Sequence, residues 1–413
     1  MPCGGIVVNF IFVMQSISME VQTNGYFDDT AVAFSYKSDH DLRKANFIFT
    51  VVNHPFISGL ATSAVRVAMG LHFPVKGLIK KTVFEHFCGG ETIHQSEETI
   101  QKLARFHVGT ILDYSVEGTK TEEGFITSAQ EILNTVDTGA TNRNVPFCVF
   151  KVTGMADMAL LEKAGTAEGL TMEELAAFDR VRKRVDRICS KAYESNVPVL
   201  VDAEHSWIQD TIDSLIYEMM RRYNKKKAII FNTFQMYRAD MLDNLQEAYR
   251  QATENGYYLG VKLVRGAYME KERKRAEKLG YPDPINPSKE ATDEMFNNGL
   301  SFCIDKPRIS LVCGSHNEYS NQYLTELMRK HGANPNDARV WFAQLLGMSD
   351  NISFNLAKSG YNVAKYVPYG PVGAVMPYLL RRANENTSVA GQSSRELILI
   401  RRELKRRRSG RST

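Results

Sequence analysis

Two lysines of this sequence lie where an ammonium group needs a partner. Lys151 and Lys262 each fall within an apolar segment of strand character, and an unpaired charge there would be costly to desolvate. Each must therefore meet an anion, which is either a protein carboxylate such as Asp202 or an anionic ligand. The residues leave both alternatives open. The other polar residues at predicted strand ends are Asp113, Glu204, His205, Asn232, Gln235, Arg265, His316, Asn317, Gln344 and Tyr366.

A second cluster, Tyr378-Leu-Leu-Arg381-Arg382-Ala-Asn-Glu385, follows the last predicted strand. In a helix, its tyrosine, two arginines and glutamate would share one face. Two neighbouring guanidinium groups suit a substrate carboxylate, which arginine binds in a planar, bidentate manner, and Glu385 could brace either arginine. The alternative is an ordinary solvated helix face.

A metal site is not expected. Asp202, His205 and His316 could in principle bind a metal ion, but no H-x-H or H-E-x-x-H spacing supports that interpretation. The six cysteines are scattered, without a C-x-x-C pair. The sequence therefore predicts a reducing compartment and no structural metal.

From Phe106 onward, short β-branched or aromatic segments alternate with segments of helical period. Residues 236–255 and 318–331 are the clearest helices, and Thr171 begins a capping box. Eight strands, each followed by a helix, predict an α/β fold of the TIM-like (β/α)8 barrel type. A doubly wound open sheet is the alternative, but no G-x-G-x-x-G follows an early strand. The predicted strands are residues 107–114, 147–153, 198–202, 228–232, 259–264, 309–313, 340–344 and 362–367.

Four regions are expected along the chain: an atypical or disordered leader (1–38), an N-terminal helical arm (39–103), the catalytic barrel (104–390) and a basic C-terminal helix or tail (391–413). The first basic residue is Lys37, so no arginine-rich transit peptide is evident. A net charge of +4 argues against nucleic acid as a partner. The basic tail could meet an anionic membrane, or it could be solvated.

Eight motifs together resemble the proline dehydrogenase (proline oxidase) family, most closely its eukaryotic mitochondrial type. The resemblance extends over roughly residues 85–407. It implies an FAD-binding barrel that oxidises L-proline to Δ1-pyrroline-5-carboxylate by hydride transfer to flavin N5, the first step of proline catabolism to glutamate. It also implies a quinone electron acceptor and a mitochondrial location, in the matrix or at the inner membrane. The motifs are Val201-Asp-Ala-Glu204, Phe231-Asn-Thr-Phe-Gln235, Lys262-Leu-Val-Arg-Gly-Ala-Tyr268, Asp283-Pro-Ile-Asn-Pro287, Ser315-His-Asn317, Gln344-Leu-Leu-Gly-Met348, Lys365-Tyr-Val-Pro-Tyr-Gly370 and Tyr378-Leu-Leu-Arg-Arg382.

The same resemblance implies roles for individual residues. Lys151, Asp202 and Tyr366 are the implied catalytic residues. The substrate-binding residues would be Lys151, Leu345, Tyr366, Tyr378, Arg381 and Arg382. The residues that would hold FAD are Asp202, Gln235, Lys262, Val264, Arg265, Gly266, Ala267, His316, Asn317 and Glu385.

Three other functions remain as alternatives. The nearest is a hydroxyproline dehydrogenase of the same fold. A second is a lyase that forms a Schiff base through Lys151 or Lys262, because a buried lysine can be tuned toward nucleophilic use. A third is a membrane-attached scaffold without a cofactor. A flavin absorbance spectrum of the purified protein separates the dehydrogenases from the other two.

Overall fold

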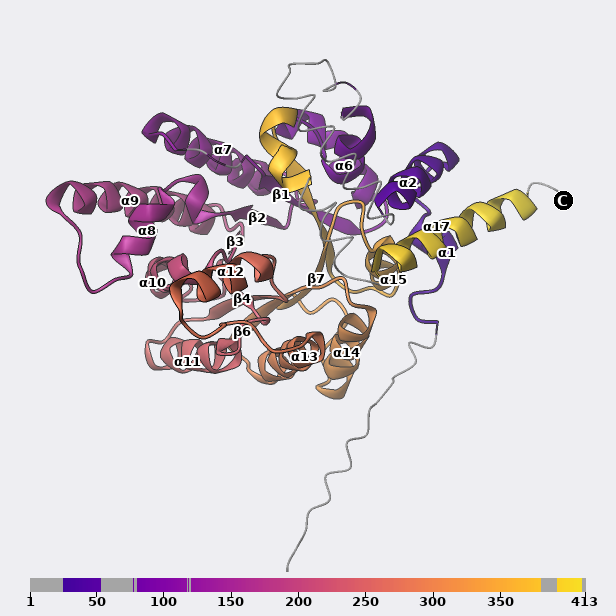
Figure 1. Ribbon diagram of the computed structural model, residues 1–413. Coiled ribbons are helices and arrows are strands. Elements are labelled where there is room, and N and C mark those ends of the chain that lie inside the picture. The colour runs from indigo at the N-terminus through magenta and orange to yellow at the C-terminus, as the bar shows by residue number, and fades with distance from the viewer. Residues whose placement is uncertain are drawn as a thin grey trace, which may run out of the picture.

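The chain folds around a closed barrel of eight parallel strands in sequential order. The computed structural model describes residues 25–52, 77, 80–116, 118, 120–379 and 392–410. The barrel closes where β1 pairs with β8, with Thr110 opposite Lys365. This confirms the predicted fold class. Figure 1 shows the helices arranged around the strands. The strands are β1 (Val108–Tyr114), β2 (Phe147–Phe150), β3 (Val199–Val201), β4 (Ile230–Gln235), β5 (Leu259–Val264), β6 (Ile309–Gly314), β7 (Val340–Leu345) and β8 (Val363–Tyr369).

Helices cover the outside of the barrel and form the arm. The predicted capping box at Thr171 is present. One predicted helix begins too early, because residues 236–240 form a turn in which the Tyr237 N–H donates to Arg265 O instead of starting a helix. The helices are α1 (Thr30–Ala33), α2 (Asp39–Val52), the π-helix η1 (Lys80–Phe84), α5 (Glu85–Phe87), α6 (Ile93–Ala104), α7 (Glu122–Thr141), the 3₁₀-helix η2 (Val152–Gly154), α8 (Met158–Ala164), α9 (Met172–Glu194), α10 (Ser206–Tyr223), α11 (Met241–Glu254), α12 (Met269–Leu279), α13 (Lys289–Asp305), α14 (Glu318–Lys330), α15 (Asp350–Lys358) and α17 (Gln392–Ser409).

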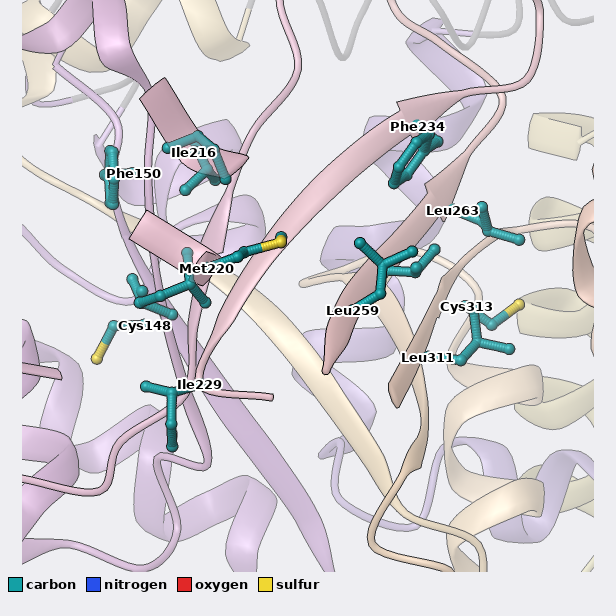
Figure 2. Packing of buried hydrophobic residues seen from close by; sticks show 14 of the residues in the cluster. Cys148, Phe150, Ile216, Met220, Ile229, Phe234, Leu259, Leu263, Leu311 and Cys313 are labelled. Carbon is teal, nitrogen blue, oxygen red and sulfur yellow. The ribbon is translucent and has the colours of Figure 1, made fainter. Parts of the chain in front are cut away.

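Side chains alternate between the two faces of each barrel strand. On β5, Leu259 and Leu263 belong to the large apolar core between strands and helices, and Figure 2 shows them among other residues of that core. Lys262 lies between these two in the sequence and is 4% exposed. The alternation therefore directs Lys262 toward the barrel interior, where a lysine needs an ionic partner.

A second apolar core joins the N-terminal arm to the C-terminal helix. It contains Leu42 and Phe49 of α2, Met376 and Tyr378 of helical residues 372–379, and Leu399 of α17, among others. Figure 1 shows α2 and α17 on the same side of the barrel, and the two helices pack together. The basic C-terminal segment is thus a packed helix with a buried face. Among the described residues, no helix has the length and apolar character needed to cross a membrane.

Candidate active site

A cavity of about 660 Å³ lies at the carboxyl ends of the strands. Each barrel strand, or the loop that directly follows it, contributes to its wall. This is the end of a (β/α)8 barrel at which active sites are built. The strand-end residues in its lining are Asp113, Lys151, Asp202, Gln235, Lys262, Gly314, Gln344, Leu345 and Tyr366.

The Asp202 carboxylate lies between two lysines from different strands. Lys151 Nζ is 2.8 Å from Asp202 Oδ2, and Lys262 Nζ pairs with Asp202 Oδ1. Lys262 Nζ also donates a hydrogen bond to Tyr366 Oη at 2.8 Å. The protein itself therefore supplies the anion that both lysines need, as the first alternative predicted.

Burial and neighbouring charges set the protonation states of this cluster. Burial opposes the charged form of Asp202, but Lys151 and Lys262 hold its pKa well below the usual range. Burial also opposes the ammonium of Lys151, yet the charges of Asp113 and Asp202 raise its pKa. The pKa of Lys262 is lowered by burial. Burial and the two aspartates raise the pKa of Tyr366, so its phenol stays neutral.

A second part of the cavity wall is rich in cations and hydrogen-bond donors. Arg265 Nε is 2.6 Å from Asp293 Oδ1, and Lys289 pairs with the other oxygen of that carboxylate. Arg265 also donates to Ser315 Oγ at 2.8 Å. The N-terminus of α14 adjoins this region, and helix N-termini favour anions. The chemistry of this wall suits the phosphates of an extended anionic cofactor.

The His316 ring is fixed by the loop of residues 346–349 and the end of β7. Its Nδ1 is 2.9 Å from Ser349 Oγ, and Leu345 N–H donates to its Nε2 at 3.4 Å. Because Nε2 accepts a hydrogen bond, a neutral ring carries its proton on Nδ1 and donates to Ser349. Both ring nitrogens have partners inside the protein, so His316 shapes the cavity wall with its ring.

A buried ionic cluster adjoins the cavity behind this loop. Lys37 Nζ and Lys365 Nζ lie 2.8 and 2.9 Å from the two carboxylate oxygens of Asp350. Glu396 of α17 lies near them and accepts a hydrogen bond from Ser349 N–H at 3.0 Å. Burial, together with the Asp350 charge, raises the pKa of Glu396 to about 7, although Lys37 and Lys365 act in the opposite direction.

The cavity brings together most of the residues predicted from the sequence that fall in the described part of the chain. Arg381, Arg382 and Glu385 lie outside the described residues. Glu204 and His205 line a smaller neighbouring cavity of about 240 Å³, which also contacts Lys151. Asn232 is buried and donates to Asp213. The predicted residues in the main cavity are Asp113, Lys151, Asp202, Gln235, Lys262, Val264, Arg265, Gly266, Ala267, His316, Asn317, Gln344, Leu345, Tyr366 and Tyr378.

Reasoning from strand ends missed several residues of the cavity wall, among them four that lie in or next to helices. Lys289 begins α13, Ser349 precedes α15, and Arg395 and Glu396 lie on α17. The serine before Asp350 resembles an ordinary helix cap, and the last two residues belong to the segment interpreted as a basic tail. The described residues contain no group of three or more histidine, cysteine, aspartate or glutamate side chains that could hold a metal ion.

Comparison with known proteins identifies the family. The family model described as "Proline dehydrogenase" matches residues 96–395. The chain belongs to the proline dehydrogenase family. It is 32% identical over 434 residues to "Proline dehydrogenase 1, mitochondrial" of Dictyostelium discoideum, a match that covers 94% of this chain and 76% of that protein. This confirms both the predicted family and an enzyme of the proline dehydrogenase type.

Some other relatives match over a smaller share of their own length. The human "Proline dehydrogenase 1, mitochondrial" is 44% identical over 241 residues, which cover 57% of this chain and 40% of that protein. A crystal structure of proline utilization A (PutA) from Bdellovibrio bacteriovorus, inactivated by N-propargylglycine, aligns with a TM-score of 0.69 at 20% identity. That alignment covers 88% of this chain and 39% of the PutA chain. At this identity, the likeness supports the barrel fold alone.

The raised pKa of Glu396 predicts a pH dependence of stability. The folded pKa of about 7 exceeds the usual 4.5, so the protonated form stabilises the fold below pH 4.5, and that contribution is lost as the pH rises through 7. The free energy of unfolding of Glu396→Gln, measured relative to that of the parent protein, should therefore be higher at pH 8 than at pH 5. The expected increase is on the order of 2 to 3 kcal/mol. Urea unfolding of both proteins at pH 5 and pH 8 measures this change. The same difference in unfolding free energy at the two pH values would contradict the prediction.

Glu403 provides a matched control on the same helix. Arg406 and Arg407 hold its pKa below the usual value despite the opposing effect of burial. Its ionised form therefore stabilises the protein above its unfolded pKa. Glu403→Gln should lose stability relative to the parent protein at pH 8, which is the opposite sign to Glu396→Gln.

Proposed function

We propose that this chain is an FAD-dependent proline dehydrogenase that oxidises L-proline to Δ1-pyrroline-5-carboxylate. The observation that carries the proposal is the barrel-end cavity. Its wall contains the residues that the family resemblance assigns to substrate and cofactor, as far as they fall in the described part of the chain. Flavin bound in this cavity would supply the hydride acceptor. The protein would supply position and charge.

Arg265 and Lys289 are the groups that would hold the cofactor phosphates, because they are cationic and lie at one part of the wall. Other parts of the cofactor would contact Gln235, Lys262 and the segment Val264–Ala267. The family resemblance also assigns Asp202, His316, Asn317 and Glu385 to cofactor binding. The cavity volume of about 660 Å³ lies within the range of small-molecule and cofactor sites.

Lys151 would bind the proline carboxylate together with Arg381 and Arg382. Asp202 stays ionised between its two lysines, so it orients Lys151 and does not act as a proton donor. Tyr366 and Leu345, with Tyr378, would confine the substrate ring. A proline that enters with a neutral amine needs no strong protein base, because its lone pair is already available to form the imine.

The ion pairs also bear on the lyase alternative. A Schiff-base lysine must be deprotonated to attack a carbonyl group. Lys151 has a raised pKa and is held in its charged form. Burial lowers the pKa of Lys262, but its ammonium is engaged by the Asp202 carboxylate and the Tyr366 hydroxyl. These contacts favour the dehydrogenase over the lyase.

Electrons would pass from the reduced flavin to a quinone, in a mitochondrial setting like that named for the relatives from Dictyostelium discoideum and human. Peripheral attachment to an anionic membrane fits the exposed residues of α2 and α17. Phe47 and Ile398 are 63% and 58% exposed there, and Arg402 and Lys405 are exposed on α17.

Purified protein should show the absorbance spectrum of bound flavin, and proline added without oxygen should bleach it. The variant Arg381→Met should keep the flavin but need more proline for half-bleaching, because it loses a charge-assisted contact worth roughly 1.5 to 3 kcal/mol. Titration of the absorbance with proline measures both effects. A colourless protein that takes up no FAD would exclude the proposed function. If Arg381→Met needed the same proline concentration for half-bleaching as the parent protein, the substrate carboxylate would have to bind elsewhere.

Proline should be a better substrate than hydroxyproline, because Tyr366 closes the pocket and is held rigidly by its hydrogen bond from Lys262. Crowding of an added hydroxyl should be worth on the order of 1 to 3 kcal/mol in the transition state. The variant Tyr366→Ser should lower the ratio of kcat/KM for proline to kcat/KM for hydroxyproline. A parent protein that prefers hydroxyproline would instead support the hydroxyproline dehydrogenase alternative.

Reversing two exposed charges should weaken membrane binding without unfolding the C-terminal helix. Arg407 is engaged by Glu403 and Asp39. The ion pair of Arg402 with Asp28 is long, at 3.9 Å, so we target Arg402 and Lys405 instead. Each cation contributes on the order of 1 kcal/mol near an anionic surface. Arg402→Glu with Lys405→Glu should lower co-sedimentation with anionic liposomes at low salt. Lys183→Glu with Lys330→Glu serves as the control, and equal losses in both double variants would contradict attachment through α17.

A further inference from the structure

The loop of residues 346–349 connects β7 to α15 and contacts side chains that line the cavity. Its last residue, Ser349, directs Oγ to His316 at 2.9 Å. Ser349 has φ 51° and ψ 44°, the left-handed conformation. A residue with a Cβ pays an energetic penalty there, so the conformation persists only where surrounding contacts impose it.

Contacts from outside the barrel impose this conformation. The Ser349 N–H donates to Glu396 Oε2 of α17 at 3.0 Å. The next residue, Asp350, is fully buried and pairs at 2.8 Å with Lys37, which lies just before α2 at the start of the N-terminal arm. Tyr36 Oη donates to the same carboxylate oxygen at 2.8 Å. Two segments at opposite ends of the chain therefore hold consecutive residues of one loop.

The rest of the loop is also fixed through its carbonyl groups. Lys365 Nζ donates to Met348 O at 2.5 Å. His86 Nε2 lies 3.0 Å from Gly347 O, and burial lowers the pKa of His86 to about 3, so its neutral ring must carry the proton on Nε2 to donate there. A Cβ on Gly347 would lie 2.5 Å from His86 O, which leaves no room for another residue.

The hydrogen bonds carry this constraint to the cavity. The Glu396 carboxylate accepts from the Ser349 N–H and so positions the Ser349 backbone. The Ser349 hydroxyl then contacts His316 Nδ1, and the Leu345 N–H donates to the other ring nitrogen. Leu345, His316 and Ser349 all line the cavity. Displacement of the loop would therefore change the shape of the wall against which a ligand rests.

We propose that Glu396 and Lys37 are positioning residues for the cofactor cavity: they hold Ser349 and Asp350 so that the loop fixes the His316 ring. The proposal rests on the proposed function in one respect, namely that the ligand of this cavity is FAD. The N-terminal arm and α17 thus do more than cover apolar surface, because binding of the cofactor depends on their docking.

Glu396 is tested by comparing removal of its carboxyl group with a substitution that keeps the hydrogen-bond acceptor. In Glu396→Ala, FAD should dissociate from the diluted holoenzyme about tenfold faster, the effect expected for one lost hydrogen bond. In Glu396→Gln, the side-chain oxygen can still accept from Ser349, so the rate should return to near that of the parent protein. Flavin fluorescence measures release.

Glu403→Ala is the matched control, because it removes an equally buried carboxylate from α17 that pairs with Arg406 and Arg407. It should lower the melting temperature while FAD release stays within about twofold of the parent rate. If Glu403→Ala released FAD as fast as Glu396→Ala, or if Glu396→Ala released it at the parent rate, the positioning role would be overturned.

Lys37, which lies just before α2, is tested in the same way. Lys37→Met should accelerate FAD release, since Asp350 loses one of its two lysines. Lys44→Met removes the ion pair with Glu85 from the same arm and should leave release unchanged. Equal rates in these two variants would contradict a specific role for Lys37.

Amide hydrogen exchange of the ligand-free chain separates this inference from the proposed function. Exchange in a peptide that spans residues 346–350 should be about tenfold faster in Glu396→Ala and near the parent rate in Glu396→Gln and Glu403→Ala. This result needs no flavin. Unchanged exchange in Glu396→Ala would overturn the positioning role, whereas failure of the parent protein to bind FAD would overturn the proposed function alone.

Discussion

The structure depends most on the shared ion pair of Asp202 with Lys151 and Lys262. A barrel interior is poor in water, and each of these charges alone would be costly to bury. The three residues come from the ends of β2 and β3 and from the middle of β5. Closure of the barrel brings them together, so the ionic cluster and the cavity above it exist only when the sheet is complete.

The second constraint is the enclosure of the cavity beside β7 and β8. There the N-terminal arm, helical residues 372–379 and α17 share one apolar core. This core covers a buried ionic cluster in which Lys37, Asp350 and Lys365 come from three separate parts of the chain. Apolar packing provides the affinity between these segments, and the ionic contacts determine how they are aligned with the loop that holds His316.

The strands were predictable because each is a short β-branched or aromatic segment between clear helices. The strand-end rule then found Lys151, Asp202, Lys262 and Tyr366, since the carboxyl ends of all parallel strands meet at one end of a barrel. The early start predicted for the helix at residues 236–255 was wrong, because Tyr237 N–H bonds to Arg265 O in the turn after β4. Such a backbone contact between distant segments leaves no local periodicity.

By itself, the sequence determined the alternation of strands and helices, the strand-end residues and the resemblance to proline dehydrogenases. The residues alone left open whether Lys151 and Lys262 meet a protein carboxylate, and the folded barrel decided it by placing Asp202 between them. Only the tertiary structure revealed that Glu396 holds Ser349 and that Lys37 holds Asp350. The physical reason is sequence separation: these pairs are 47 and 313 residues apart, and no helical or strand period connects residues so distant.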